Sequence, residues 1–133
     1  MTSEESGADP LLDAIGMTVL DKPDGDILGY LEPTDLTKGA FLPGGVLGTC
    51  VEIFGWKAVA LEAERKGFEG AEWWPVSFQV ELLRAAEPKR HAIRGTAERI
   101  GRRHAFARVE IAPADGGAAV TTGTVILVNA ASS

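Results

Sequence analysis

Apolar residues are most concentrated between Pro43 and Lys66, where they repeat at helical spacing. From Gly39 to Leu61 only two residues are charged. Steps of three and four residues give one stripe typical of a buried helical face: Leu47, Cys50, Val51, Phe54, Ala58 and Leu61. A second stripe starts with small residues and ends with large ones: Gly45, Gly48, Thr49, Glu52, Trp56 and Val59. The pattern predicts a long, nearly enclosed helix with the Glu52 carboxylate inside the enclosure.

Shorter patterns before this helix predict a small helix and a hairpin. Asp9, Pro10 and Gly16 occupy positions typical of an N-cap, a first turn and a helix C-terminus. Strand-like runs at 17–22 and 27–32 flank a Pro-Asp-Gly-Asp sequence, which favours a turn between two antiparallel strands. The long helix then follows a connecting loop.

After Gly67 the chain is strand-like to its end, with runs near 76–82, 91–100, 105–111 and 118–128. The last two runs are separated by an Asp-Gly sequence that is typical of a hairpin turn. In the first run four apolar residues alternate with polar ones, and we expect the apolar set to form a buried face: Val76, Phe78, Val80 and Leu82. The order predicts an α+β fold in which a curved antiparallel sheet wraps around a long central α-helix.

The length of 133 residues suits a single domain, which we expect to span residues 9–133 after a disordered segment 1–8. The N-terminus is polar and acidic and lacks a signal-peptide pattern, and no apolar run reaches the roughly 20 residues of a membrane span. We therefore expect a cytoplasmic protein with no membrane partner. Cys50 lies on the apolar stripe and is interpreted as a small core residue. The separated residues His91 and His104 make no metal motif.

The net charge of −6 disfavours nucleic acid as a partner, but the charge is unevenly distributed. The segment 84–108 contains only two acidic residues, Glu87 and Glu98, and eight basic ones: Arg84, Lys89, Arg90, Arg94, Arg99, Arg102, Arg103 and Arg108. A local basic patch on an acidic protein favours a small polyanionic ligand. Alternatively, these side chains are solvated outward positions of strands.

Chemistry is suggested by two features of the long helix. Gly44 and Gly45 at its start leave backbone N–H groups that can hold a phosphate or polarise a carbonyl. Glu52 follows Gly44 by eight residues, roughly 12 Å along a helix, which is too far for both to act on one carbonyl. If both do act on one bond, they come from two antiparallel copies of the helix in an obligate dimer. Alternatively, Glu52 is paired with a core cation or faces a solvent groove, and the glycines serve close packing.

Several motifs together resemble hotdog-fold acyl-CoA thioesterases of the phenylacetate-degradation and 4-hydroxybenzoyl-CoA type. In that family a His-Gly-Gly sequence begins the helix, and an acidic residue follows nine residues after the histidine; here Pro43-Gly44-Gly45 precedes Glu52 at that spacing. The runs VSFQVELLRAAE, IGRRHAFARVEIAPADGG and TTGTVILVN are similar to later strands and turns of the family. The resemblance covers about residues 16–129 and implies a homodimer or a dimer of dimers.

The resemblance also implies roles for individual residues. The Gly44 N–H would bind the thioester carbonyl, and Glu52 of the partner subunit would act as general base or nucleophile. Coenzyme A would enter only as part of the substrate, with its phosphates contacted by Arg102, Arg103 and Arg84. The remaining residues expected to border the substrate are Gly45, Trp56, Thr37, Pro43 and Ser77.

Two of these positions depart from the family. Pro43 replaces the histidine, and Thr37 stands where an Asn or Gln often orients the water or the carboxylate. The leading hypothesis is hydrolysis of an acyl-CoA thioester to free acid and CoA. The alternative is a catalytically silent hotdog protein that binds acyl-CoA or lipid.

Overall fold

The computed structural model describes residues 9–39 and 41–132, so the predicted disorder of residues 1–8 lies outside the described part. The first element is the short helix α2, Pro10–Ile15. The Asp9 carboxylate caps it by accepting hydrogen bonds from the N–H groups of Leu11 at 3.0 Å and Leu12 at 3.3 Å. Gly16 ends it in the left-handed region at φ +84°. The predicted helix and both of its end signals are confirmed.

Six antiparallel strands form one curved sheet with the order β1-β2-β4-β5-β6-β3. Their bounds are β1 Met17–Asp24, β2 Ile27–Leu31, β3 Trp73–Leu82, β4 His91–Ile100, β5 His104–Pro113 and β6 Thr121–Asn129; a 3₁₀ turn, η1 Ala130–Ser132, follows. The predicted hairpin is β1–β2, and it turns at Gly25 with φ +63°. The predicted α+β architecture is confirmed.

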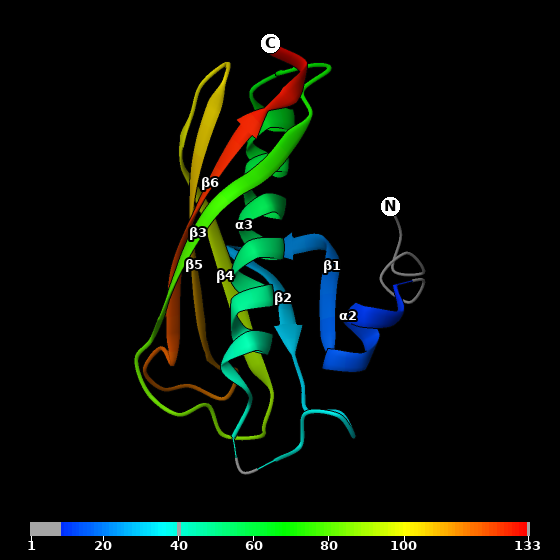
Figure 1. The fold of residues 1–133 in the computed structure, drawn as a ribbon, viewed down its shortest axis with the longest axis vertical. Coiled ribbons are helices and arrows are strands. Elements are labelled where there is room, and N and C mark those ends of the chain that lie inside the picture. The colour runs from blue at the N-terminus through cyan, green and yellow to red at the C-terminus, as the bar shows by residue number, and fades with distance from the viewer. Residues whose placement is uncertain (1–8, 40, 133) are drawn as a thin grey trace.

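The central helix α3, Gly44–Arg65, lies along the inner face of this sheet (Figure 1). Five residues of the predicted buried stripe are buried, whereas the sixth, Leu61, is half-buried. The helix ends in a Schellman motif, in which Gly67 N–H donates to Glu64 O at 3.1 Å and Phe68 N–H donates to Ala63 O at 2.9 Å. By length and composition α3 could also cross a membrane, but eight of its residues are buried in the protomer, which is the environment of a core helix.

Contact between α3 and the sheet depends on residues that lack a side chain. A Cβ atom at Gly55 of α3 would overlap Val125 of β6, and a Cβ atom at Gly123 of β6 would overlap Val51 of α3. The two glycines therefore let the helix and β6 approach one another more closely than any other residue type would allow. This contact fixes which face of α3 turns toward the sheet and which face is left open.

The prediction of a buried apolar face on β3 is wrong for the protomer. Val76, Phe78 and Leu82 are 58%, 45% and 57% exposed, and Val80 is half-buried. These side chains are exposed because β3 is the outer strand of the sheet and pairs only with β6. An outer strand with a free edge and exposed apolar side chains is a site for association with another chain.

Replacing Gly55 with alanine should destabilise the protein, although alanine favours helices over glycine by about 1 kcal/mol. The Cβ atom of Val125 itself lies 2.8 Å from the added methyl group, so rotation of the valine cannot relieve the overlap. Overpacking of this kind costs about 1–3 kcal/mol, and we expect a net loss in the free energy of unfolding measured in denaturant. Ala60→Gly at an exposed position of α3 isolates the propensity contribution. A Gly55→Ala protein more stable than the parent would contradict the close contact.

Candidate active site on the open face of α3

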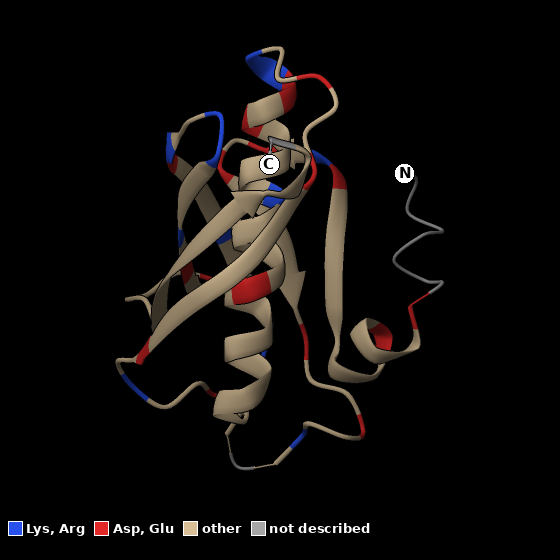
Figure 2. Cartoon of the chain, turned by 45° about the horizontal axis from the view of Figure 1, so that its top comes forward, with Lys and Arg blue, Asp and Glu red and all other residues tan. Residues whose placement is uncertain are grey.

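Glu52 lies midway along the open face of α3. It is the one charged residue between Gly44 and Trp56 (Figure 2). The residue is half-buried, and within the described part of the chain its carboxylate has no hydrogen bond and no ion pair. The predicted enclosure is therefore wrong, because this side of the helix faces a free sheet edge. The alternative of a carboxylate paired with a core cation is also excluded for the described residues.

The start of α3 presents unused hydrogen-bond donors. Pro43 is the N-cap residue, with φ −64° and ψ 144°, and its carbonyl accepts from the N–H groups of Val46 at 3.0 Å and Leu47 at 3.2 Å. The N–H groups of Gly44 and Gly45 have no acceptor among the described residues, and both glycines are exposed. Two free N–H groups at the positive end of a long helix can bind an oxyanion or a phosphate.

The glycines on this face are not needed for packing inside the protomer. A Cβ atom at Gly45 would meet no atom within 4 Å, and one at Gly48 would make only ordinary contacts, at 3.8 Å to Val80 and 4.0 Å to Phe78. Gly44 is tighter, with Leu82 Cδ1 at 3.0 Å from the added atom. Glycine destabilises a helix by about 1 kcal/mol relative to alanine, and packing inside the protomer does not require it at Gly45 and Gly48. The open space at these positions can be filled by a molecule outside the protomer.

Aromatic side chains border the same face beyond Glu52. Trp56 lies one helical turn after Glu52, and its ring centroid is 5.2 Å from that of Trp74, with an interplanar angle of 48°. Of the two adjacent tryptophans at the start of β3, Trp73 is buried and Trp74 is 51% exposed. Adjacent residues of a strand point to opposite faces, which accounts for the different exposure of the two rings.

Two predicted substrate contacts lie away from Glu52. Thr37 is buried in its own loop, where its Oγ1 accepts the N–H of Thr34 at 2.8 Å. Ser77 is exposed on β3, opposite Ile126 in the register, while the neighbouring Phe78 and Val80 contact the α3 side. Successive side chains of a strand alternate, so Ser77 points to the outer face of the sheet. The protomer therefore does not bring either hydroxyl to the carboxylate.

The basic residues fall into two groups. Several are neutralised by neighbours, with Arg90 3.0 Å from Glu32, Arg94 3.2 Å from Asp26 and Lys89 3.3 Å from Asp115. These three residues match the interpretation that the basic side chains occupy solvated outward positions of strands. The predicted phosphate contacts Arg84, Arg102 and Arg103 have no carboxylate partner in the described ranges, and neither do Arg99 and Arg108. These cations remain available to an anion.

The three predicted phosphate contacts lie at opposite ends of β3. Arg84 lies two residues after the last residue of the strand, and its Nε donates to Ala119 O at 3.0 Å. Arg102 and Arg103 form the β4–β5 turn, and their carbonyls accept from Asn129 at 3.0 and 2.8 Å. Asn129 in turn pairs with Trp73, the first residue of β3. A ten-residue strand spans about 33 Å, so one protomer does not bring these arginines together.

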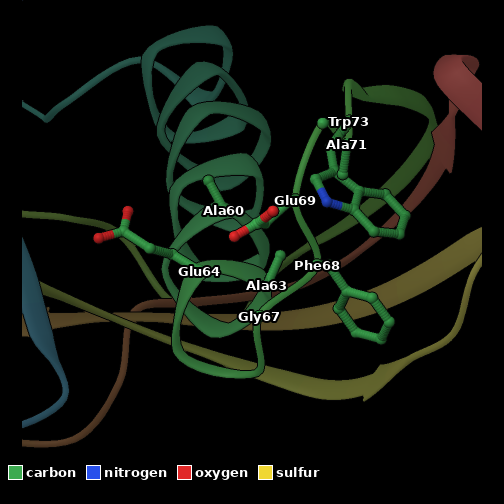
Figure 3. A pocket seen from close by; sticks show the side chains of 9 residues that line it. Ala60, Ala63, Glu64, Gly67, Phe68, Glu69, Ala71 and Trp73 are labelled. Carbon is green, nitrogen blue, oxygen red and sulfur yellow. The ribbon is translucent and has the colours of Figure 1, made fainter.

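A separate hollow of about 380 Å³ lies at the C-terminal end of α3 (Figure 3). Its lining includes the aromatic residues Phe68 and Trp73 and the carboxylates Glu64 and Glu69. It includes neither Glu52 nor the helix start. Two carboxylates disfavour a polyphosphate ligand by charge, so this hollow is a poor match for the nucleotide end of CoA.

The fold is shared with solved structures of thioesterase superfamily proteins. One such protein is 24% identical, with a TM-score of 0.76, over 95% of this chain and 93% of its own. A thioesterase from Haemophilus influenzae has a TM-score of 0.79 at 18% identity, and the match covers 96% of this chain and 90% of its own. A phenylacetic acid degradation-related protein from Ralstonia eutropha has a TM-score of 0.68 at 21% identity, covering 90% of each chain. The predicted hotdog fold, with a curved antiparallel sheet around a long central helix, is confirmed by this likeness.

A further structure with this fold was solved with CoA. This protein from Bacillus halodurans has a TM-score of 0.64 at 14% identity, over 75% of this chain and 68% of its own. No family model and no curated protein sequence match the chain.

Cys50 takes no part in this site, because it is fully buried on the opposite side of α3. Burial raises the pKa of the Cys50 thiol to about 12, so the thiol stays protonated at neutral pH. We expect the native protein to react very slowly with a chromogenic disulfide reagent at pH 8. In denaturant the same thiol should react at the rate of an ordinary cysteine. Rapid labelling of the folded protein would contradict the burial of Cys50.

Proposed function

We propose that the protein is an acyl-CoA thioesterase that uses Glu52 and the N–H of Gly44. The observation that carries the proposal is that an unpaired carboxylate and unused helix N–H donors share one open, glycine-lined face of α3. General acid–base groups and oxyanion donors are the two components that hydrolysis of a thioester needs. The fold shared with thioesterase superfamily structures supports this class of reaction.

The reaction requires two copies of the chain, since Glu52 and Gly44 of one helix are roughly 12 Å apart. In an antiparallel pair of helices, Glu52 of one subunit lies opposite Gly44 of its partner. The N–H of Gly44 then stabilises the negative charge that develops on the thioester oxygen. In one route Glu52 removes a proton from the water that attacks the carbonyl carbon, the C–S bond breaks and the acid is released. In the other route the Glu52 carboxylate attacks the carbonyl carbon, the C–S bond breaks, and water then hydrolyses the resulting anhydride to release the acid and restore Glu52. In both routes the CoA sulfur leaves as a thiol after taking a proton.

CoA as the leaving group is supported by two observations. Arg102 and Arg103 lack carboxylate partners among the described residues, and arginine binds phosphate through a planar pair of N–H donors. A structure with the same fold was solved with CoA. The dimer is supported by the exposed apolar edge strand β3. A dimer of dimers and a cytoplasmic location stay predictions.

A second candidate function is the binding of acyl-CoA without hydrolysis. Pro43 occupies the position where the resembling family has histidine, and the Thr37 hydroxyl is engaged in its own loop. Pro43 has no side-chain donor or acceptor, so it cannot replace a histidine in orienting a water molecule. A silent protein would be stabilised thermally by CoA thioesters but would release no thiol.

The test is thiol release from short, long and aromatic CoA thioesters by the parent protein and by Glu52→Gln. Removing a catalytic base typically lowers the rate of the chemical step by about 10²–10⁴-fold. We therefore expect kcat of the variant to fall by at least about 100-fold. The isosteric amide should leave the fold and the dimer intact. Glu64→Gln on the exposed part of α3 is the matched control and should retain parental activity.

Two results would contradict the proposal in different ways. Parental turnover by Glu52→Gln would remove Glu52 from the mechanism. Binding of CoA thioesters by the parent without any thiol release would replace hydrolysis by the second candidate function.

A further inference from the structure

The hollow at the C-terminal end of α3 contains a hydrogen-bond donor that the protein leaves unused. Trp73 is 6% exposed, and within the described part of the chain its indole Nε1 is buried without a hydrogen-bond partner. Figure 3 shows this nitrogen on the edge of the ring that faces α3 and Glu69, across the hollow. Buried donors are normally paired, so an unpaired N–H directed into a hollow indicates a position for an acceptor from another molecule.

The charge around the hollow favours a cation. Its lining carries the carboxylates of Glu64 and Glu69, and no basic residue of the described chain lines it. The nearby cations Arg65 and Lys66 pair with Glu62 instead, at 2.8 and 3.8 Å, so neither lining carboxylate has an ion pair among the described residues. The hollow also lies at the negative end of the α3 dipole, which adds to the attraction for positive charge.

Aromatic rings and a loosely held segment complete the hollow. Phe68 and Trp73 contribute their rings to the lining, and aromatic faces attract cations that carry alkyl groups. Gly70 and Ala71 make no backbone hydrogen bond with any described residue, and Gly70 has φ +72°. Because no backbone hydrogen bond fixes these two residues, a small shift of the segment gives the oxygen of a ligand access to Nε1 of Trp73.

We propose that this hollow binds a small alkylammonium ion that carries a hydroxyl or carbonyl oxygen close to its charged nitrogen. The charged group is attracted by the carboxylates of Glu64 and Glu69 and by the rings of Phe68 and Trp73, and the oxygen accepts the N–H of Trp73. The lining includes neither Glu52 nor the start of α3, so this site is independent of the proposed hydrolysis.

Calorimetric titration with choline and three analogues tests the chemistry of recognition. Choline should bind at least about tenfold more tightly than the neutral alcohol in which carbon replaces its charged nitrogen. Tetramethylammonium lacks the oxygen and should bind at least about threefold more weakly than choline. Phosphocholine should also bind at least about threefold more weakly, because the carboxylates repel its phosphate. This last comparison distinguishes a free amine from the headgroup of a phospholipid.

The indole N–H signals in a spectrum of isotope-labelled protein show where the ligand binds. The chain has three tryptophans, and the signal that is lost in Trp73→Phe belongs to Trp73. Choline should shift this signal, because its oxygen accepts the indole N–H. Tetramethylammonium has no acceptor and should shift the signal much less.

Three variants separate the parts of the site. Trp73→Phe keeps a ring but removes the N–H, and it should weaken the binding of choline at least about threefold more than that of tetramethylammonium. Glu69→Gln removes one charge at an exposed position and should weaken both cations at least about threefold. Glu72→Gln is the matched control, because Glu72 is exposed and lies outside the lining, and it should leave both affinities unchanged.

Several results would overturn the proposal. Equal affinity for choline and the neutral alcohol would exclude a cation site, and equal effects of Glu69→Gln and Glu72→Gln would place binding outside the hollow. An unshifted Trp73 signal at about 10 mM choline, a concentration that occupies even a weak site, would exclude the hydrogen bond. Tighter binding of phosphocholine than of choline would exclude a free amine as the ligand. Far-ultraviolet circular dichroism checks folding, and Glu69→Gln keeps the test decisive if Trp73→Phe fails to fold.

Discussion

The close contact between α3 and β6 is the constraint on which the rest of the structure depends. Gly55 and Gly123 remove the Cβ atoms that would hold the helix away from the sheet, and large side chains such as Phe54 fill the space on both sides. Because this face of α3 packs on the sheet, Glu52 and the glycines at the helix start are held on the opposite face of the helix. A rigid core element therefore holds the candidate catalytic groups, which favours precise placement.

A protomer of this kind is incomplete in two respects that share one cause. The sheet ends in an outer strand with exposed apolar side chains, and the helix carries an unpaired carboxylate roughly 12 Å from its unused donors. In the proposed dimer, association through the exposed side chains of β3 would bury them by the hydrophobic effect. The twofold symmetry of that dimer would bring the carboxylate of one copy to the donors of the other. The proposed association and the proposed chemistry would thus depend on the same surface.

Much of the fold could be predicted from the sequence, because the signals were local. The short helix is marked by Asp9 and Gly16, and the buried stripe of α3 repeats at helical spacing. The burial of β3 could not be predicted, since alternation at Val76 and Phe78 indicates an apolar face but not what covers it. Thr37 and Ser77 were placed by analogy of sequence position, while loop hydrogen bonds and strand parity decided where their hydroxyls lie.

The most direct test of a site shared between subunits is the activity of mixed dimers. Gly44→Pro removes the N–H donor without disturbing the helix start, because Pro43 already has the ψ of 144° that a following proline requires. Gly44→Ala keeps the N–H and is its control. Mixed with Glu52→Gln in equal amounts after subunit exchange, Gly44→Pro should restore about a quarter of the parental thiol release, because half of the dimers gain one intact site. Activity no higher than the average of the two variants would contradict a site built from two copies.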